Sequence, residues 1–271
     1  MDEVTKKILN GTSYSPVGRC IYCGATGKLE KEHILPFGLS GTATLPKSSC
    51  RACAAITGTF ERIVLRGPFL AVRVYRDLKS RTKYEKAVKT IPLSYIRDGK
   101  EHTIALDIDK YPMLLHFPIF APPVYLTGNP EYTSGIILSG IASVLFGPRP
   151  EDFAKSLGAS EVQVASDSQP VAFARMIAKI AYAFAIAEGV MDDVEGDSFV
   201  LPSILGKADD IGRWVGTLAK PIQTYVDQLH QIVIHYEKEN GLLITEVRLF
   251  ADSETPSYGV ILGKLKSENA E

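Results

Sequence analysis

The chain has 271 residues, of which 45% are apolar and 23% are charged, and its formal net charge is −1. These proportions are ordinary for a soluble globular protein with enough material for a real core, and the length argues against a small disulfide-stabilised secreted domain. The N-terminus has no apolar stretch and Arg175 and Lys179 interrupt the most apolar segment, so we expect no signal peptide, no membrane span and a reducing cytoplasmic location.

The charge is unevenly distributed. Residues 1–99 contain 17 Lys and Arg against 8 Asp and Glu, whereas the remaining residues contain 13 against 23. A basic front third indicates a polyanionic partner, and the alternative is a solvated basic surface without a partner.

Residues 1–18 are polar and predict a short helix or an arm, followed by a turn. All four cysteines come next, as two Cys-x-x-Cys pairs: Cys20 with Cys23, and Cys50 with Cys53. Such pairs present four thiolates at the separation that a tetrahedral zinc ion needs, so we predict a structural Zn²⁺ site. Two disulfides and an iron–sulfur cluster are the weaker alternatives.

The segment between the two pairs predicts a strand over 28–35. From Cys50 onward apolar residues recur at helical spacing, which predicts a helix ending near Leu65, before Gly67 and Pro68. We therefore expect a small domain over 1–67, stabilised by zinc because its own core is small. Residues 68–271 would form a second domain of unknown role.

The next segments are predicted mainly as strands. Residues 69–76 predict a strand, and a basic run over 76–89 follows, either a nucleic-acid contact or a solvated linker. Strands at 93–96 and 102–108 flank Asp98-Gly99, a hairpin signal. Further strands are expected at 114–121, 123–126 and 162–165, whereas 136–146 is apolar without a clear assignment.

Residues 170–190 predict a helix that is apolar on nearly every side and is therefore buried. Arg175, Lys179 and Tyr182 form one stripe along it. We expect these long side chains to extend toward solvent, and the alternative is that the stripe contacts the first domain or a phosphate backbone.

The tail predicts a hairpin, with strands at 231–236 and 242–250 around Asn240-Gly241 and a third strand at 258–262. The expected fold class is α+β: a zinc-bound ββα (treble-clef) domain, followed by a domain in which an antiparallel sheet packs on one long buried helix.

One motif suggests a chemical activity for residues 18–66, the zinc-binding segment that contains both Cys pairs. The two Cys pairs, the sequence Glu32-His33-Ile34-Leu35-Pro36 between them and the following helix resemble the HNH (ββα-metal) endonuclease family over about residues 18–66. This resemblance implies hydrolysis of nucleic-acid phosphodiester bonds. We expect DNA rather than RNA as the partner, although the sequence does not distinguish the two. The resemblance makes His33 the general base and Glu32 a ligand of Mg²⁺ or another catalytic divalent ion, while the zinc is structural.

The chain departs from the family pattern at two places. Ala54 follows the last cysteine where the family has Asn or His, and the Asn that the family often has a few residues before the second Cys pair is missing, since no Asn occurs between residues 11 and 128. The available substitutes are Thr42, Thr44, Thr57 and Glu61. Two readings therefore stay open, an HNH-type endonuclease and a catalytically inactive zinc-finger module that binds nucleic acid or a protein. A third is that the second domain carries the function.

Overall fold

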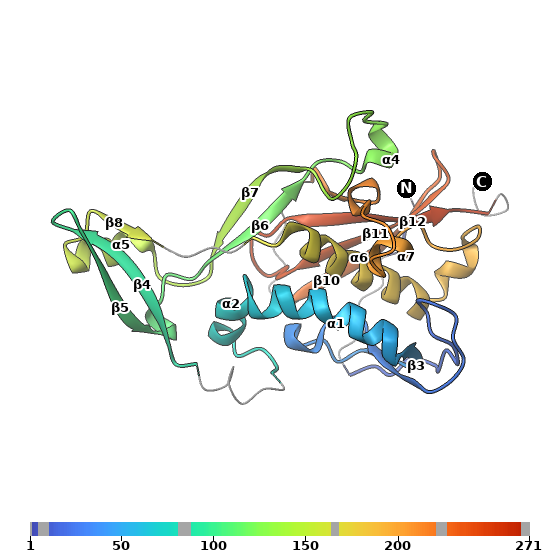
Figure 1. Ribbon diagram of the computed structural model, residues 1–271, viewed down its shortest axis with the longest axis horizontal. Helices are drawn as coiled ribbons and strands as arrows, with labels where there is room; N and C mark the ends of the chain where they lie inside the picture. Colours follow the sequence, from blue (N-terminus) through green and yellow to red (C-terminus); the bar gives the residue numbers. More distant parts are fainter. Residues whose placement is uncertain (1, 5–10, 81–87, 164–167, 221–226, 267–271) are drawn as a thin grey trace.

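The computed structural model describes residues 2–4, 11–80, 88–163, 168–220 and 227–266. It is a mixed α+β structure with several antiparallel sheets and one buried 18-residue helix, as the sequence predicts at this level. Figure 1 shows an elongated molecule, with a main body at one end and a smaller sheet projecting at the other.

The N-terminal segment supplies the first elements of the body. It contains β2 (Leu29–His33), a 3₁₀ turn η1 (Phe37–Leu39), β3 (Thr44–Cys50) and α1 (Arg51–Arg66). Strands β2 and β3 pair antiparallel, and α1 begins directly after Cys50 and ends at Gly67. Gly41 is required where the chain turns between these strands, because a Cβ there would lie 2.2 Å from the Leu35 carbonyl oxygen.

The largest sheet has the order β1-β10-β11-β12-β9. Its strands are β1 (Asp2–Val4), β10 (His230–Glu237), β11 (Leu242–Leu249), β12 (Ser257–Lys264) and β9 (Val215–Thr217). The predicted tail hairpin and its third strand are confirmed, and the backbone of residues 2–4 adds an edge strand where we expected a helix or an arm. Residues 5–10 lie outside the described residues.

Helix α6 (Pro170–Ala187) lies between this sheet and α1. It is long and apolar enough to cross a membrane by length and composition, yet 67% of it is buried inside the protein. Its buried side chains join a continuous core that extends from Cys20 to the large sheet. The division into domains at residue 67 stays a prediction.

The remaining elements form the projecting part, its connections, and short helical turns that pack against α6 in the main body. The hairpin predicted around Asp98-Gly99 is confirmed, and both turn residues have positive φ. The elements are β4 (Thr90–Arg97), β5 (Lys100–Asp107), η2 (Ile108–Lys110), β6 (Leu114–Phe120), α4 (Val124–Thr127), β7 (Leu138–Leu145), α5 (Pro150–Leu157), β8 (Glu161–Gln163), η3 (Val190–Asp193), α7 (Leu201–Ile204) and η4 (Ile211–Arg213).

Two predicted strands are wrong. Residues Leu70–Tyr75 form the helix α2, because buried Val72 and Arg73 pack against the end of α1 and tertiary packing outweighs the β-branched composition. Residues Val124–Thr127 form the single helical turn α4, which follows Pro123 and ends at Gly128 with positive φ. The unassigned stretch 136–146 contains β7. The basic run is described only in part, since 81–87 lie outside the described residues, as do 164–165 of the strand predicted at 162–165.

Candidate metal centre and adjoining cleft

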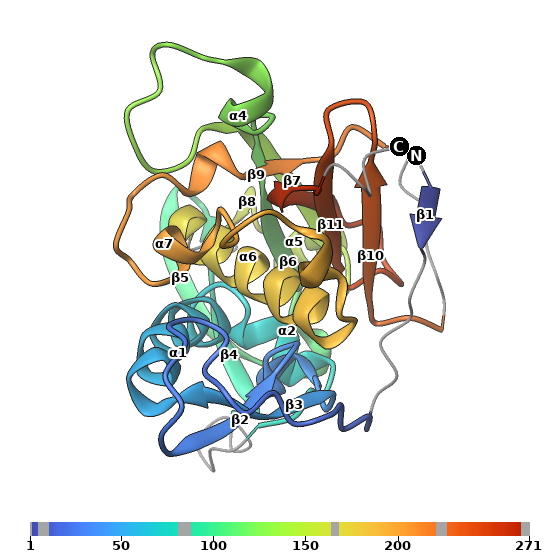
Figure 2. The ribbon, with the colours of Figure 1, turned by 90° about the vertical axis from the view of Figure 1, so that its right-hand side faces the viewer.

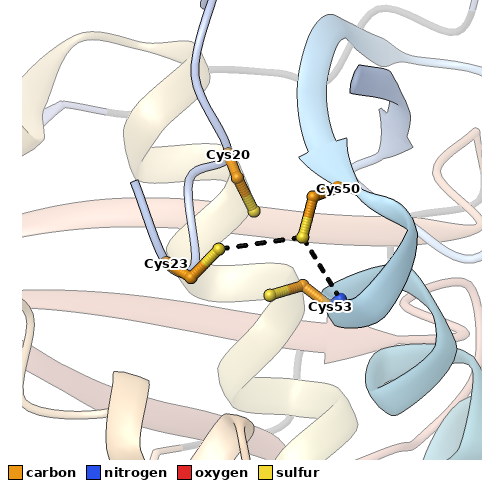
Figure 3. Close-up of side chains that lie close together, drawn as sticks. All are labelled: Cys20, Cys23, Cys50 and Cys53. Atoms are coloured by element: carbon orange, nitrogen blue, oxygen red, sulfur yellow. Dashed lines mark hydrogen bonds between the residues drawn. The ribbon is translucent and has the colours of Figure 1, made fainter. Parts of the chain in front are cut away.

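The four cysteines form one cluster, as predicted. Their sulfur atoms all lie within 4.8 Å of one another, and Figure 3 shows all four side chains converging from two segments of chain. A tetrahedral zinc with Zn–S bonds of about 2.3 Å requires S–S separations of about 3.8 Å. The Sγ atoms of Cys23 and Cys50 are 3.7 Å apart, so the donor set fits a structural Zn²⁺ ion.

Local backbone structure brings these thiols together. In the first pair, the Gly24 N–H donates to the Cys20 carbonyl at 2.9 Å, and Gly24 has the positive φ that the tight turn needs. In the second pair, Cys50 is the N-cap of α1 and its sulfur accepts from the Cys53 N–H. That backbone hydrogen bond lowers the pKa of the Cys50 thiol to about 7, whereas burial raises the pKa of Cys53.

A cleft with a volume of about 430 Å³ adjoins the zinc-binding segment. Side chains of β2, α1 and the segment after α2 line it. They include His33, both candidate acids Glu32 and Glu61, and Thr57. Of the four predicted substitutes for the missing HNH residues, Thr57 and Glu61 line the cleft, whereas Thr42 and Thr44 are absent from its lining.

The lining of this cleft is rich in cationic side chains. Three Glu residues are outnumbered by five Lys or Arg residues: Lys31, Arg62, Arg66, Arg73 and Lys79. Arg73 is buried and shapes the wall, because its guanidinium donates to the carbonyls of Gly38 at 2.6 Å and Leu65 at 2.7 Å. Lys31, Arg62 and Lys79 are exposed, and the Lys79 ammonium lies 5.9 Å from the centre of the Phe37 ring.

Lys179 is not part of the cleft lining but contacts two acids that are, Glu32 and Glu61. Its ammonium group lies 2.7 Å from Glu32 Oε1 and 3.0 Å from Glu61 Oε1, and it also donates to the His33 carbonyl. The Lys179 side chain is 1% exposed. Burial by itself lowers the pKa of Lys179, but the two carboxylates outweigh burial and raise it to about 12, so the ammonium stays charged.

The stripe on α6 therefore corrects our expectation. Instead of extending to solvent, Lys179 and Tyr182 contact the zinc-binding segment, and the Tyr182 hydroxyl donates to the Ile21 carbonyl at 2.6 Å. Arg175 lies 4.9 Å over the Phe60 ring of α1 and donates to the Ile204 carbonyl. The stripe therefore contacts residues 1–67, which is the alternative that the sequence left open.

This geometry bears on how each predicted site residue could act. Glu32 is buried and its Oε1 already faces a cation, so a divalent ion at this carboxylate would have to compete with Lys179. His33 is half-buried, lines the cleft and lies edge-on to Phe37, with a ring-centroid distance of 5.9 Å. Lys179 is the residue whose role the sequence analysis missed, and the available signal was that it is one of only two cations, with Arg175, in an otherwise apolar helix.

None of the other histidines lines the cleft. His230 is buried, its Nδ1 accepts from the Phe250 N–H at 3.2 Å, and its Nε2 donates to the Leu39 carbonyl at 2.9 Å. Desolvation lowers the pKa of His230 to about 4, so this ring is neutral at pH 7 and ties η1 to the large sheet.

Comparisons with known proteins supply no further identification. No family model, no curated protein and no solved structure matches this chain.

Proposed function

We propose that this protein binds nucleic acid, DNA in preference to RNA, in the cleft beside its zinc-binding segment. The observation that carries the proposal is the cationic lining around His33, with Lys31, Arg62 and Lys79 exposed. Contacts of Lys and Arg side chains with phosphate groups provide the sequence-independent part of nucleic-acid affinity. The zinc-held ββα unit is then a treble clef of the HNH type, and its reduced thiols suit a cytoplasmic protein.

The ion pairs of Lys179 with Glu32 and Glu61 favour binding over metal-dependent cutting. Lys179 supplies the positive charge that Glu32 and Glu61 would otherwise take from a divalent ion. In this proposal the two acids and Lys179 hold β2 and α1 against α6. The exposed cations of the cleft, Lys31, Arg62 and Lys79, would then contact the phosphate backbone.

Binding can be measured by fluorescence anisotropy, with labelled duplex DNA and single-stranded RNA at several salt concentrations. We expect affinity to fall steeply with salt, and the double variant Arg62→Gln/Lys79→Gln to lower the slope by about 1 to 2 in log–log terms. The matched control is Lys100→Gln/Lys155→Gln, because both lysines are exposed and lie in the projecting part. Equal effects of the two double variants, or no binding by the wild type, would refute the proposal.

Hydrolysis is the second candidate function, an HNH-type endonuclease. The observation in its favour is that His33, Glu32 and Glu61 line the same cleft. His33 would take a proton from the attacking water, and a divalent ion, where bound, supplies positive charge to the phosphate. Plasmid DNA and RNA should be incubated with the zinc-loaded protein and Mg²⁺, Mn²⁺ or EDTA, beside His33→Ala. Divalent-dependent cutting that His33→Ala abolishes would establish the nuclease, whereas binding without cutting would leave the finger as a binding module.

A further inference from the structure

Strand β7 is an edge strand. It pairs antiparallel with β6 on one side, and no strand in the described part of the chain pairs with its other side. Figure 1 shows this two-stranded ribbon linking the main body to the projecting sheet.

The backbone groups that face away from β6 follow from the ladder. The Phe146 N–H donates to the Met113 carbonyl at 2.7 Å, and Leu145 lies opposite Leu114. Inward-facing and outward-facing residues alternate in an antiparallel pair. The N–H and C=O groups of Ile141, Ser143 and Leu145 therefore point away from β6.

The side chains of the same residues are also accessible. Ile141 is 61% exposed and Leu145 is 38% exposed, whereas the intervening Val144 is buried in the core. Natural edge strands are usually protected by charged residues, by proline or by a covering element. Residues 138–145, Leu-Ser-Gly-Ile-Ala-Ser-Val-Leu, contain neither charge nor proline.

We propose that the β7 edge pairs with the β7 edge of a second copy of this chain, across a two-fold axis. Ser143 lies opposite Ser143 of the other copy, and Ile141 opposite its Leu145. This register pairs outward-facing backbone groups with outward-facing ones, and it keeps exposed side chains beside exposed side chains. Because the strand is uncharged, self-pairing brings no like charges together, and two-fold dimers are the commonest closed assemblies.

The proposal is tested by sedimentation velocity on the zinc-loaded full chain over roughly 1–100 μM, a range suited to a modest interface. The wild type is expected to shift with concentration from 29.6 kDa toward twice that mass. Ile141→Lys would place two ammonium groups within this interface and is expected to weaken the dimer at least tenfold. Leu126→Lys is the matched control, because Leu126 is 50% exposed in α4 and should leave dimerisation unchanged.

A second variant targets the backbone. Ser143→Pro removes an outward N–H while the backbone hydrogen bonds between β7 and β6 remain, so it should also weaken the dimer at least tenfold. Ser143→Ala is its control, because both substitutions remove the 2.6 Å hydrogen bond between Ser143 Oγ and His116 Nδ1 of β6, and Ser143→Ala keeps the outward N–H. Retained zinc and an unchanged circular dichroism spectrum would show that each variant folds. A wild type that stays monomeric up to about 100 μM would overturn the proposal. In that case, a strand of another protein would be the alternative partner of the β7 edge. A dimer that survives both Ile141→Lys and Ser143→Pro would also overturn the proposal.

Discussion

Replacing Lys179 with Met tests how the zinc-binding segment is held against the rest of the protein. The substitution keeps an unbranched side chain of similar length on α6 but removes the ammonium that lies 2.7 Å from Glu32 and 3.0 Å from Glu61. Glu32 and Glu61 are 9% and 20% exposed, so both carboxylates would be left in a largely dry site without their cation. Removing one partner of a buried ion pair typically costs about 3–5 kcal/mol.

For a chain of this size, such a loss corresponds to a fall in melting temperature on the order of 10 °C. The assay is thermal and urea unfolding of the zinc-loaded protein, followed by circular dichroism at neutral pH.

The triple variant Lys179→Met/Glu32→Gln/Glu61→Gln is the matched control, because it removes the charges on both sides of the pair. It should be more stable than Lys179→Met alone, since no uncompensated carboxylate remains. A loss below about 1 kcal/mol in Lys179→Met, typical of a surface ion pair, would contradict the buried network. So would a triple variant less stable than the single one.

Three further predictions follow from the metal centre, from His230 and from the large sheet. The protein should contain one zinc per chain by elemental analysis, and Cys53→Ser should lose it together with much of the folded structure of residues 18–66; full zinc content in that variant would contradict the four-thiolate site. His230 should destabilise the fold at acid pH, because its pKa is about 4 in the folded state and about 6.5 in the unfolded state. The free energy of unfolding should therefore fall by about 3 kcal/mol as the pH falls from about 6.5 to 4. In His230→Gln, the midpoint of urea unfolding should depend less on pH across this range. Burial acts to raise the pKa of Glu246, but hydrogen bonds from His235 and Lys220 outweigh it and lower the pKa to about 2. The stabilisation of the fold by this carboxylate is therefore fully present above about pH 4.5 and is lost as the pH falls toward 2. Glu246→Gln should lose less stability over that pH range, as measured by urea unfolding.

Local patterns were sufficient to predict much of this structure. The spacing of the cysteines predicted their clustering, and Asp98-Gly99 and Asn240-Gly241 predicted two hairpins, because short-range geometry decides both. The apolar composition of residues 170–187 was enough to predict a buried helix.

The errors come from contacts between distant segments. Residues 70–75 have a strand-like composition, yet packing of Val72 and Arg73 against α1 makes them helical. The partners of Lys179 lie 147 and 118 positions away in sequence, at Glu32 and Glu61, and no local pattern reports such a pairing. Nothing in the motif Glu32-His33 indicates that a lysine stands behind it.

The most direct test of nucleic-acid binding at the cleft is hydrogen–deuterium exchange, measured with and without a bound DNA duplex. Peptides that cover residues 30–38 and 54–66 contain most of the cleft lining and should gain protection, whereas those over β4 and β5 in the projecting part should not change. Protection confined to the projecting part or to the large sheet would contradict the account and would move the binding site away from the zinc-binding segment.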